Sequence, residues 1–441
     1  MGEHDDSDKS TTRVDRNHSN KRSSRRSRKS RGSRKWLKSP FLWLGLLVVL
    51  ALAGGGAFFV LNSRGDSASA SDNGSPVADS GSSTDATATT GEVPLASSTQ
   101  QIVVEMSLEE KIGQMMMIGF EGYEPSPQVT SAIQEKHIGS LVIFGRNINS
   151  KEQVAAMDAS LQALAAQAKQ PAKLMIAIDQ EGGSTRRFTD IGPFYSEPMI
   201  GEMGSEAGVA AAQQQASSAA RDLKKLGINT NLAPVVDVSD GWGSIMDGRS
   251  YGADSELVTE LGGMAVRGYN NATTISCPKH FPGHGSADGD SETTLPTVDL
   301  SLEAIQQSEL PPFQQVIKEG APMIMVAHLS VPALDATGTP ASLSKPIVTD
   351  LLRKNLAFPG VIITDDLEMG AITASMSVGE AAVAAVMAGN DMVIVGHTTE
   401  NQLLAYDALL AAVKSGKIKE DDINKSVTRI IEMKKKYRLE K

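Results

Sequence analysis

The sequence predicts a (β/α)8 barrel preceded by a transmembrane helix and a disordered linker. Three observations support this fold class: a basic head that leads into a long apolar stretch, a Ser-rich segment after it, and eight short apolar runs that alternate with segments of helical spacing. Strands that are apolar throughout, each followed by a helix, form a parallel sheet with covered faces. Eight such units in ~340 residues favour a closed barrel over an open sheet.

Residues 1–39 form a basic segment, with 13 Lys and Arg against 5 Asp and Glu in a chain whose formal net charge is −10. Arms that bind nucleic acid combine such charge with interleaved aromatic side chains, and the only aromatic here is Trp36. The segment also leads directly into the apolar stretch. We therefore interpret it as a cytoplasmic topology determinant and expect no nucleic-acid partner.

The segment 40–62 is predicted to anchor the chain in a membrane. Its apolar run from Phe41 to Leu61 has 21 uncharged residues, enough to cross ~30 Å of hydrocarbon. Because basic flanks stay in the cytoplasm, we expect a single-pass protein of the cell membrane whose larger part is extracellular. The alternative is secretion after cleavage, since Ala-Ser-Ala at 68–70 has the small residues of a signal-peptide cleavage site.

Residues 63–100 are predicted to be a disordered linker, and residues 101–441 the folded domain. The linker is dominated by Ser, Ala, Thr, Gly and Asp, and such a composition cannot bury enough apolar surface to fold. The single cysteine, Cys277, can form no disulfide within the chain. We expect it to pack as a small apolar residue on a strand.

The predicted barrel elements follow from the apolar pattern. Strands are expected at 114–119, 141–144, 174–179, 232–236, 275–280, 323–328, 361–365 and 392–395. Helical spacing predicts helices at 127–136, 151–168, 207–226, 254–270, 302–319, 344–357, 377–388 and 399–415. The remaining residues, 416–441, are enough for one further helix.

Several predicted strands end in polar side chains that could take part in catalysis or ligand binding. These are Asp179, Asp237, Lys279 with His280, His328, and Asp365 with Asp366. Barrel interiors are filled mainly by branched apolar residues, and catalytic groups come from the carboxyl ends of the strands, where the following loops converge. The pattern therefore predicts one polar site assembled from these strand ends.

Several stretches of the chain resemble a known family. They are AIDQEGGSTRRF (177–188), NLAPVVDV and DGRSYG (both within 231–252), KHFPGHG (279–285) and ITDDLEMGAI (363–372). They are similar to the signatures of glycoside hydrolase family 3, specifically its single-barrel β-N-acetylglucosaminidases, from about residue 105 to 437. The resemblance implies an enzyme that removes terminal β-linked N-acetylglucosamine from a carbohydrate substrate, without a cofactor or a metal.

Retaining hydrolysis needs a carboxylate that attacks the anomeric carbon, and a second group that protonates the leaving oxygen and then deprotonates water. The resemblance places the attacking carboxylate at Asp365, which would form a covalent glycosyl-enzyme intermediate. Its neighbour Asp366 should point elsewhere, because adjacent strand residues face opposite sides. We interpret Asp366 as a helix cap or a supporting carboxylate.

The resemblance also implies a set of substrate-binding residues, namely Asp179, Arg187, Arg249, Lys279 and His280. Asp179 would accept hydrogen bonds from sugar hydroxyls, while the other side chains would donate to them or orient the carboxylates. Structural alternatives are an ion pair of either arginine with Asp237 or Asp247. For Asp179 the alternative is a helix cap.

His328 is expected to contact the substrate or to support such a contact, rather than to donate a proton. His280 and His284 stand four residues apart, a spacing that on a helix would suit a metal. Pro282 and Gly283 forbid a helix here. We therefore expect no metal site and interpret His284 as a residue that organises its loop.

The chain departs from the family pattern at the proton donor. In the family's N-acetylglucosaminidases this loop ends in Asp-Ser-His or Asp-Thr-His, whose His, oriented by the Asp, is the general acid/base. Here the triplet is Asp290-Ser291-Glu292. We expect Glu292 to take this role, with a pKa raised by an apolar site and by the charge of Asp365. Two alternatives stay open: Asp290, Asp288 or another loop supplies the proton, or the barrel binds glycan with little or no turnover.

The predicted function is therefore hydrolysis of β-N-acetylglucosaminides in cell-wall-type glycans such as peptidoglycan. An ionised Glu292 would repel an anionic acceptor, so phosphorolysis is disfavoured. One alternative is a β-glucosidase of the same family. Another is a catalytically silent glycan-binding barrel at the cell surface, although an intact Asp365 argues against a pure binder.

Overall fold

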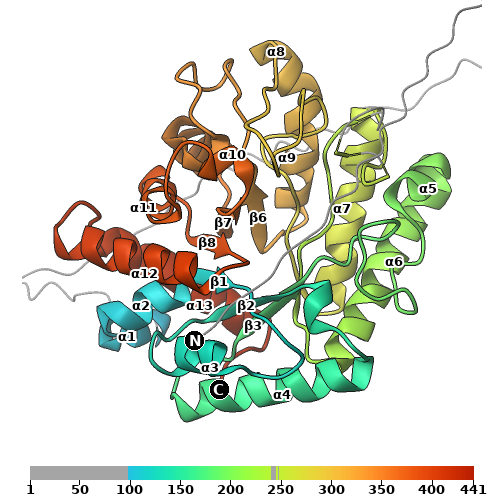
Figure 1. The fold of residues 1–441 in the computed structure, drawn as a ribbon. Coiled ribbons are helices and arrows are strands. Elements are labelled where there is room, and N and C mark those ends of the chain that lie inside the picture. Colours follow the sequence, from blue (N-terminus) through green and yellow to red (C-terminus); the bar gives the residue numbers. More distant parts are fainter. Residues whose placement is uncertain (1–97, 240–244, 247) are drawn as a thin grey trace, which may run out of the picture. The chain divides into compact units, whose positions relative to one another are not determined.

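The computed structural model describes residues 98–239, 245–246 and 248–441 (Figure 1). The predicted basic segment, the predicted transmembrane segment and all but the last three residues of the predicted linker lie outside this part. Those three residues, 98–100, already belong to the first helix, α1 (Ser98–Glu105). In the described part of the chain, no helix combines the length and the apolar character that crossing a bilayer requires.

Eight parallel strands form the centre of the fold. They are β1 (Met116–Ile118), β2 (Ser140–Ile143), β3 (Met175–Ile178), β4 (Thr230–Asn231), β5 (Ile275–Ser276), β6 (Met323–Val326), β7 (Val361–Asp366) and β8 (Met392–Val395). Their order in the sheet is β5-β4-β3-β2-β1-β8-β7-β6. Nearly all strand residues are buried, which accounts for the uninterrupted apolar runs in the sequence.

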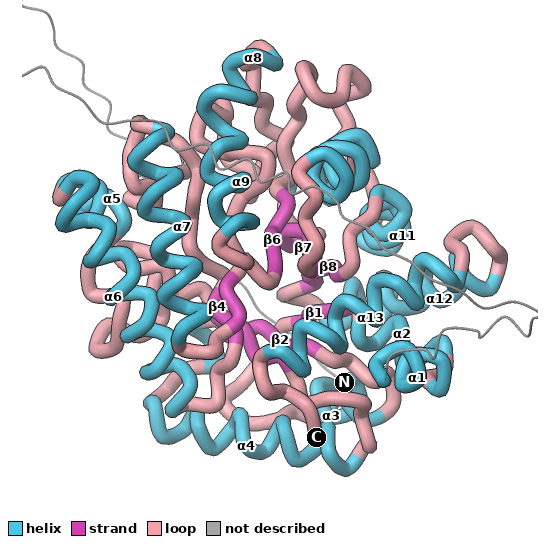
Figure 2. The backbone as a smooth tube through the Cα atoms, turned by 180° about the vertical axis from the view of Figure 1, so that it is seen from behind, coloured by secondary structure: helices cyan, strands magenta, loops and turns pink. Residues whose placement is uncertain are grey.

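Backbone hydrogen bonds connect the two outer strands of this order, β5 and β6. The segment beyond β5 makes this connection, since Phe281 N–H donates to Met325 O at 2.8 Å and Ala327 N–H donates to Phe281 O at 2.9 Å. This seam gives the sheet the arrangement of a barrel, and Figure 2 shows the strands enclosed by helices. The predicted fold class is therefore confirmed at the level of an eight-stranded parallel α/β fold of barrel type.

Helices follow the strands and cover the outer face of the sheet (Figure 1). The α-helices after α1 are α2 (Leu108–Gln114), α3 (Pro127–Gln134), α4 (Lys151–Gln167), α5 (Glu197–Glu202), α6 (Gly204–Lys225), α7 (Ser255–Asn271), α8 (Leu302–Ala304), α9 (Leu310–Lys318), α10 (Gly370–Thr373), α11 (Val378–Ala388), α12 (Thr399–Lys414) and α13 (Glu420–Lys436). Two π-helical segments, η2 (Ile305–Glu309) and η4 (Pro346–Asn355), and two 3-10 turns, η1 (Gly145–Asn147) and η3 (Ala341–Leu343), complete the set.

Side-chain caps explain where several helices begin. Ser126, Ser150 and Ser377 each accept a hydrogen bond from a backbone N–H in the first turn of α3, α4 and α11. Asp254 does the same for α7. Helix α11 ends at Gly389, whose φ of 113° lies in the left-handed region that glycine adopts without strain. These signals fix the loops that follow the strand ends.

The observed elements differ from the predicted ones mainly where proline or a π-helix occurs. β4 (Thr230–Asn231) lies just before the strand predicted at 232–236, and β5 covers only the first two residues of the strand predicted at 275–280. Pro234 and Pro278 inside the predicted strands have no N–H to donate. The predicted helix at 302–319 is divided into α8, η2 and α9. Helices α1, α2, α5 and α10 had no predicted counterpart.

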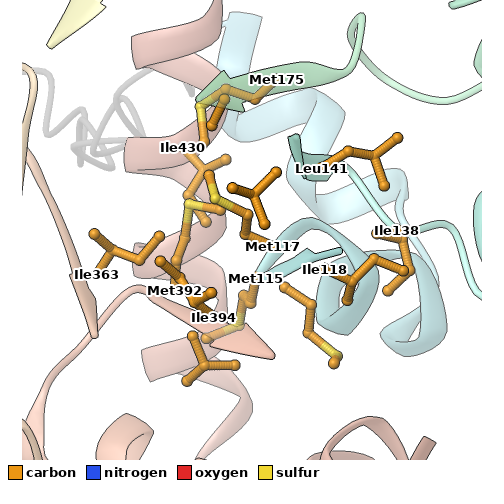
Figure 3. Close-up of a cluster of buried hydrophobic side chains, with 14 of the residues drawn as sticks. Met115, Met117, Ile118, Ile138, Leu141, Met175, Ile363, Met392, Ile394 and Ile430 are labelled. Atoms are coloured by element: carbon orange, nitrogen blue, oxygen red, sulfur yellow. The ribbon is translucent and has the colours of Figure 1, made fainter. Parts of the chain in front are cut away.

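A methionine-rich core lies at the ends of the strands that are opposite to the polar strand ends. Figure 3 shows Met117 of β1, Met175 of β3 and Met392 of β8 clustered with Ile430 of α13. All four side chains are fully buried. Flexible thioethers fill irregular spaces of this kind. The C-terminal helix α13 therefore contributes to the barrel core.

A buried charge cluster also joins α13 to the sheet. Asp391, which immediately precedes β8, is fully buried and accepts hydrogen bonds from Arg353 of η4 at 2.6 Å and from Arg429 of α13 at 2.6 Å. Ser426 donates to the same carboxylate at 2.8 Å. A single side chain thus links β8, η4 and α13.

We predict that Asp391→Ala strongly destabilises the fold. Removing this carboxylate leaves two guanidinium groups without their buried counter-charge, which costs about 3–5 kcal/mol. The free energy of unfolding in urea, followed by circular dichroism, measures the loss. Asp407→Ala, on the exposed face of α12, is the control and should change stability by less than about 0.5 kcal/mol. Similar stability of the two variants would contradict this role of Asp391.

Candidate active site

The polar strand ends meet in one cavity of about 270 Å³. Its walls come from the carboxyl ends of β2 to β8 and from the loops that follow. The charged and histidine side chains that line it are Asp179, Glu181, Arg187, Arg249, Lys279, His280, His284, Glu292, Asp365, Asp366 and His397. Most of the predicted site residues therefore share this cavity. Asp290 and His328 do not line it.

Asp179, at the end of β3, is held between two cations. Lys279 Nζ donates to Asp179 Oδ1 at 2.8 Å, and Arg187 Nη2 donates to Asp179 Oδ2 at 3.2 Å. Burial alone would raise the pKa of Asp179, but the charges of Lys279 and Arg187 outweigh it and lower the pKa to about 2. Asp179 is therefore an ionised acceptor, with its carboxylate fixed in direction.

Glu181 is a site residue that the sequence analysis missed. Arg249 forms a two-pronged ion pair with it, with Nε and Nη2 each 2.9 Å from a carboxylate oxygen, and Lys279 Nζ lies 2.7 Å from Glu181 Oε1. Burial would raise the pKa of Glu181, yet Lys279 and Arg249 lower it. Glu181 lies three residues beyond the end of β3, so the strand pattern gave no signal for it.

The partner of Arg249 differs from the structural alternatives suggested by the sequence. Its guanidinium pairs with Glu181 and not with Asp237, while Asp247 lies outside the described residues. Burial would lower the pKa of Arg249, but Glu181 raises it. Arg249 and Lys279 thus both pair with Glu181, and Lys279 also pairs with Asp179.

Asp237 holds the KHFPGHG loop (279–285) in place through hydrogen bonds. This fully buried carboxylate accepts from the ring Nδ1 of His280 at 2.7 Å and from the backbone N–H of His284 at 2.7 Å. Burial would raise the pKa of Asp237, but His280 lowers it. Because a guanidinium only donates, His280 Nε2 is the acceptor toward Arg249 Nη2 at 3.4 Å. The ring of His280 is thereby fixed in orientation at the cavity wall.

The predicted acid/base loop is folded against the β7 exit. Gly370 N–H donates to Glu292 O at 2.8 Å, and Ala371 N–H donates to Ser291 O at 3.1 Å. A Cβ on Gly370 would lie 2.5 Å from Thr293 O, so only glycine allows this approach. His284 Nε2 lies 3.1 Å from Ser291 Oγ, which supports the predicted loop-organising position of His284.

Glu292 and Asp290 have different surroundings within this loop. Asp290 Oδ1 accepts the backbone N–H of Glu292 at 2.8 Å, so it stabilises the turn and lies outside the cavity wall. The Glu292 side chain lines the cavity, although the residue keeps an exposed flank. Partial burial raises the pKa of Glu292, and the charges of Asp365 and Asp290 raise it further. The carboxyl therefore retains its proton to higher pH than an ordinary glutamate does.

Asp365 and Asp366 both line the cavity, whereas the sequence predicted that only one would face it. The reason is a register shift in the pairing of β7 with β8 between Ile363 and Asp366, which interrupts the strict alternation of side chains. Asp366 accepts the backbone N–H groups of Glu368 at 3.0 Å and Gly396 at 3.1 Å. Burial raises its pKa to about 7, with Glu368 and Asp365 adding to the effect.

His328 was expected to contact the substrate or to support such a contact, and it does not line the cavity. It is fully buried. Its Nδ1 is 2.6 Å from Ser342 Oγ, and its Nε2 is 3.0 Å from Asp366 O. Burial lowers the pKa of His328, so the ring is neutral and donates to the backbone that carries the β7 carboxylates. This position corresponds to a supporting residue.

The arrangement combines three chemical capacities in one cavity. Asp179 and its cations present fixed hydrogen-bonding groups on the side of β3 and β5. Asp365 presents a carboxylate from β7, and Glu292 presents a carboxyl group with a raised pKa from the loop after β5. Hydrolysis of a glycoside by two carboxyl groups requires such parts: side chains that bind the sugar, a carboxylate and a proton donor.

Comparison with known proteins connects this cavity to a family. Residues 107–433 match the glycosyl hydrolase family 3 N-terminal domain. The chain is 33% identical over 389 residues to beta-hexosaminidase A of Pseudoalteromonas piscicida, covering 80% of this chain and 63% of that protein. It is 34% identical over 335 residues to an uncharacterized secreted glycosyl hydrolase of Arthroderma benhamiae, covering 74% of this chain and 93% of the relative.

A solved structure shows the same likeness. The glycoside hydrolase family 3 beta-N-acetylglucosaminidase from Paenibacillus sp. str. FPU-7 superposes with a TM-score of 0.72 at 40% sequence identity, over 76% of this chain and 63% of that chain. The present chain thus spans less than two thirds of the length of the Pseudoalteromonas and Paenibacillus proteins. The likeness is to the part of those proteins that matches the barrel.

We predict that Glu181→Gln makes stability less dependent on pH in acid. Asp179 and Glu181 have folded pKa values below their unfolded values of ~4, so the unfolded state binds more protons as the pH falls from ~5 to ~2, and stability is lost. Each such group contributes a slope of up to about 1.4 kcal/mol per pH unit. Urea unfolding at a series of pH values should therefore give a shallower slope for the variant. Glu206→Gln, an exposed residue of α6, is the control, and a slope equal to wild type in both variants would refute the prediction.

Proposed function

The chain belongs to glycosyl hydrolase family 3, and we propose that it is a retaining β-N-acetylhexosaminidase that removes terminal β-linked N-acetylglucosamine. The observation that carries the proposal is that Asp365 and Glu292 line the same cavity as the ion-paired cluster around Asp179. The names of the relatives support an N-acetylated sugar as the substrate. The chemistry of the cavity supports hydrolysis with two carboxyl groups.

The sugar ring is held on the β3 and β5 side of the cavity in this proposal. Asp179 accepts hydrogen bonds from ring hydroxyls, and it does so as a fixed anion because Lys279 and Arg187 hold it. Lys279, Arg187, Arg249 and His280 face the same space and bind the ring as well. Such preformed hydrogen bonds orient the anomeric carbon toward β7 without reorganisation during the reaction.

Asp365 then attacks the anomeric carbon, and the bond from this carbon to the glycosidic oxygen breaks. Glu292 gives its proton to the departing oxygen, which leaves as an alcohol. In the second step the ionised Glu292 takes a proton from water, the water oxygen bonds to the anomeric carbon, and Asp365 is released. Asp290 supports this cycle through the turn that positions Glu292, and His328 supports it through the backbone of Asp366.

The wider setting is also part of the proposal. The apolar run at 40–62 and the basic segment before it support a single-pass anchor with the barrel outside the cytoplasm. A barrel displayed there would meet cell-wall-type glycans such as peptidoglycan fragments, which contain β-linked N-acetylglucosamine. An ionised Glu292 beside Asp365 also favours water over an anionic acceptor such as phosphate.

We predict that Asp365→Ala lowers kcat on 4-nitrophenyl β-N-acetylglucosaminide by at least ~10³-fold, because the attacking group is lost. A 5-fluoro analogue of the activated sugar should label wild type at residue 365, as shown by mass spectrometry of the peptides. Asp299→Asn, an exposed carboxylate of the segment that precedes α8, is the control and should keep the activity. Binding of N-acetylglucosaminides without turnover in wild type would instead indicate a silent glycan-binding barrel, and turnover of only the β-glucoside would indicate a β-glucosidase.

The pH dependence tests the role of Glu292. Because the protonated form is the general acid and its pKa is raised, kcat/KM should stay high in acid and fall as the pH rises through that pKa. Glu292→Gln should abolish this alkaline limb. It should also lower kcat/KM by about 10²–10⁴-fold on substrates with poor leaving groups and much less on those with good ones. A limb that persists unchanged in Glu292→Gln would assign the proton to another residue.

A further inference from the structure

A small cavity of about 20 Å³ adjoins the candidate active site on the side of the ion-pair cluster. Glu181 lines both cavities, and the other polar side chains of the small one are Glu197, Gln215, Tyr251 and Tyr269. Helices α5, α6 and α7, which supply much of its wall, lie side by side (Figure 1 and Figure 2). Four alanines with short side chains complete much of the wall: Ala212, Ala216, Ala233 and Ala265. A volume of this size holds about one water molecule.

Glu197 is a buried carboxyl group with an unpaired oxygen. It is the first residue of α5, and only 3% of it is exposed. Its Oε2 has no hydrogen-bond partner among the described residues. The cations of the cluster, Arg249 and Lys279, pair with Glu181 instead. Burial raises the pKa of Glu197 well above its usual value, and the charge of Glu181 raises it further. Glu197 therefore keeps its proton and has an O–H to donate.

Glu181 has one acceptor position left on the side chain. Its Oε1 is contacted by Arg249 Nη2 at 2.9 Å and by Lys279 Nζ at 2.7 Å. Its Oε2 accepts from Arg249 Nε at 2.9 Å. Since a carboxylate has about four acceptor positions, two on each oxygen, these contacts leave one position on Oε2.

The hydroxyl group of Tyr269 is oriented by Asn231. Asn231 Oδ1 accepts the backbone N–H of Gln180 at 3.0 Å, which fixes the direction of its amide group. The amide nitrogen then donates to the hydroxyl oxygen of Tyr269 at 2.8 Å. Because this oxygen is the acceptor, its own O–H is left to donate to a further group. Tyr269 lines the small cavity, so that group belongs there.

We propose that the small cavity binds one water molecule, which accepts hydrogen bonds from Glu197 O–H and Tyr269 O–H and donates one to Glu181 Oε2. Three hydrogen bonds of this kind are typical of a buried water. Glu197 is then a positioning residue, since it holds Glu181 through the water, and Glu181 holds Arg249 at the wall of the active-site cavity. An ionised Glu197 would lack the O–H and would place a second anion beside Glu181. The consequence for sugar binding rests on the proposed function, whereas the water site does not.

A crystal structure of the wild-type protein at high resolution tests the water site directly. We expect one ordered water within hydrogen-bond distance of Glu197, Glu181 and Tyr269. Infrared spectroscopy tests the proton, because a protonated carboxyl group and a carboxylate absorb at different frequencies. The difference spectrum between wild type and Glu197→Gln should contain the band of a protonated carboxyl group. A cavity without an ordered water, or a carboxylate band in that difference spectrum, overturns the proposal.

Binding of N-acetylglucosamine tests the positioning role in an Asp365→Asn background, where calorimetry does not depend on turnover. Adding Glu197→Leu or Tyr269→Phe should weaken binding by at least ~5-fold, the effect of about one net hydrogen bond. Adding Glu197→Gln should leave the affinity unchanged, because an amide N–H replaces the carboxyl O–H. Glu202→Gln is the matched control, since Glu202 is an exposed residue of the same helix, and it should also leave the affinity unchanged.

The outcomes separate this inference from the proposed function. The positioning role is overturned if Glu197→Gln weakens binding as much as Glu197→Leu does, or if Tyr269→Phe binds as tightly as the background. If wild type hydrolyses no N-acetylglucosaminide and the background binds no N-acetylglucosamine, the proposed function fails, while an ordered water in the crystal still supports the site. Tyr269→Phe removes a single oxygen atom, so the binding test remains valid even where Glu197→Leu fails to fold.

Discussion

The ion-pair cluster of Lys279 and Arg249 with Asp179 and Glu181 is the constraint on which the rest of the site depends. Lys279 Nζ lies within 2.8 Å of one carboxylate and 2.7 Å of the other, and it is almost completely buried. Taking such charges out of water costs several kcal/mol per ion, which their mutual attraction seldom exceeds by much. A packed apolar core would stabilise the barrel at least as well. The cluster is therefore best explained by the ligand, since it holds an ionised acceptor and its donors in fixed directions before any sugar arrives.

The second constraint is the contact between loops of different strands. The loop after β5 carries Glu292, and the segment after β7 carries Asp365, so their relative position depends on how these two loops meet. Gly370 permits the meeting, because a side chain there would collide with the carbonyl oxygens of Glu292 and Thr293. Asp237 fixes the start of the same loop through His280 and His284. Glu292, the proposed proton donor, is thus placed by backbone contacts and a buried carboxylate, and its own turn is closed by Asp290.

Much of this arrangement could be predicted from the sequence, because the strand pattern and the strand-end residues are local signals. The run at 392–395 coincides with β8, and Asp179, Lys279 and Asp365 share one cavity as expected of strand ends in a barrel. What could not be predicted depends on three-dimensional pairing. Glu181 follows its strand by three residues, and its importance comes from Arg249, 68 positions away. The register shift in β7 turns Asp366 into the cavity, and His328 is directed away from it by Ser342. No single-sequence periodicity reports such contacts.

The exchange of histidine for glutamate changes the charge balance of the cavity. Of the groups that line it, Arg187, Arg249 and Lys279 are each within ion-pair distance of Asp179 or Glu181. Their positive charge is therefore largely neutralised by Asp179 and Glu181, and little of it remains to balance the other carboxyl groups of the cavity. A histidine in the loop would add no negative charge, whereas an ionised Glu292 adds one beside two other carboxyl groups. Burial and the repulsion between these carboxyl groups both favour the protonated form, so the pKa values of Glu292 and Asp366 are raised. The same excess of acidic groups would repel an anionic acceptor, which agrees with the proposal that Glu292 acts as the acid and water as the acceptor.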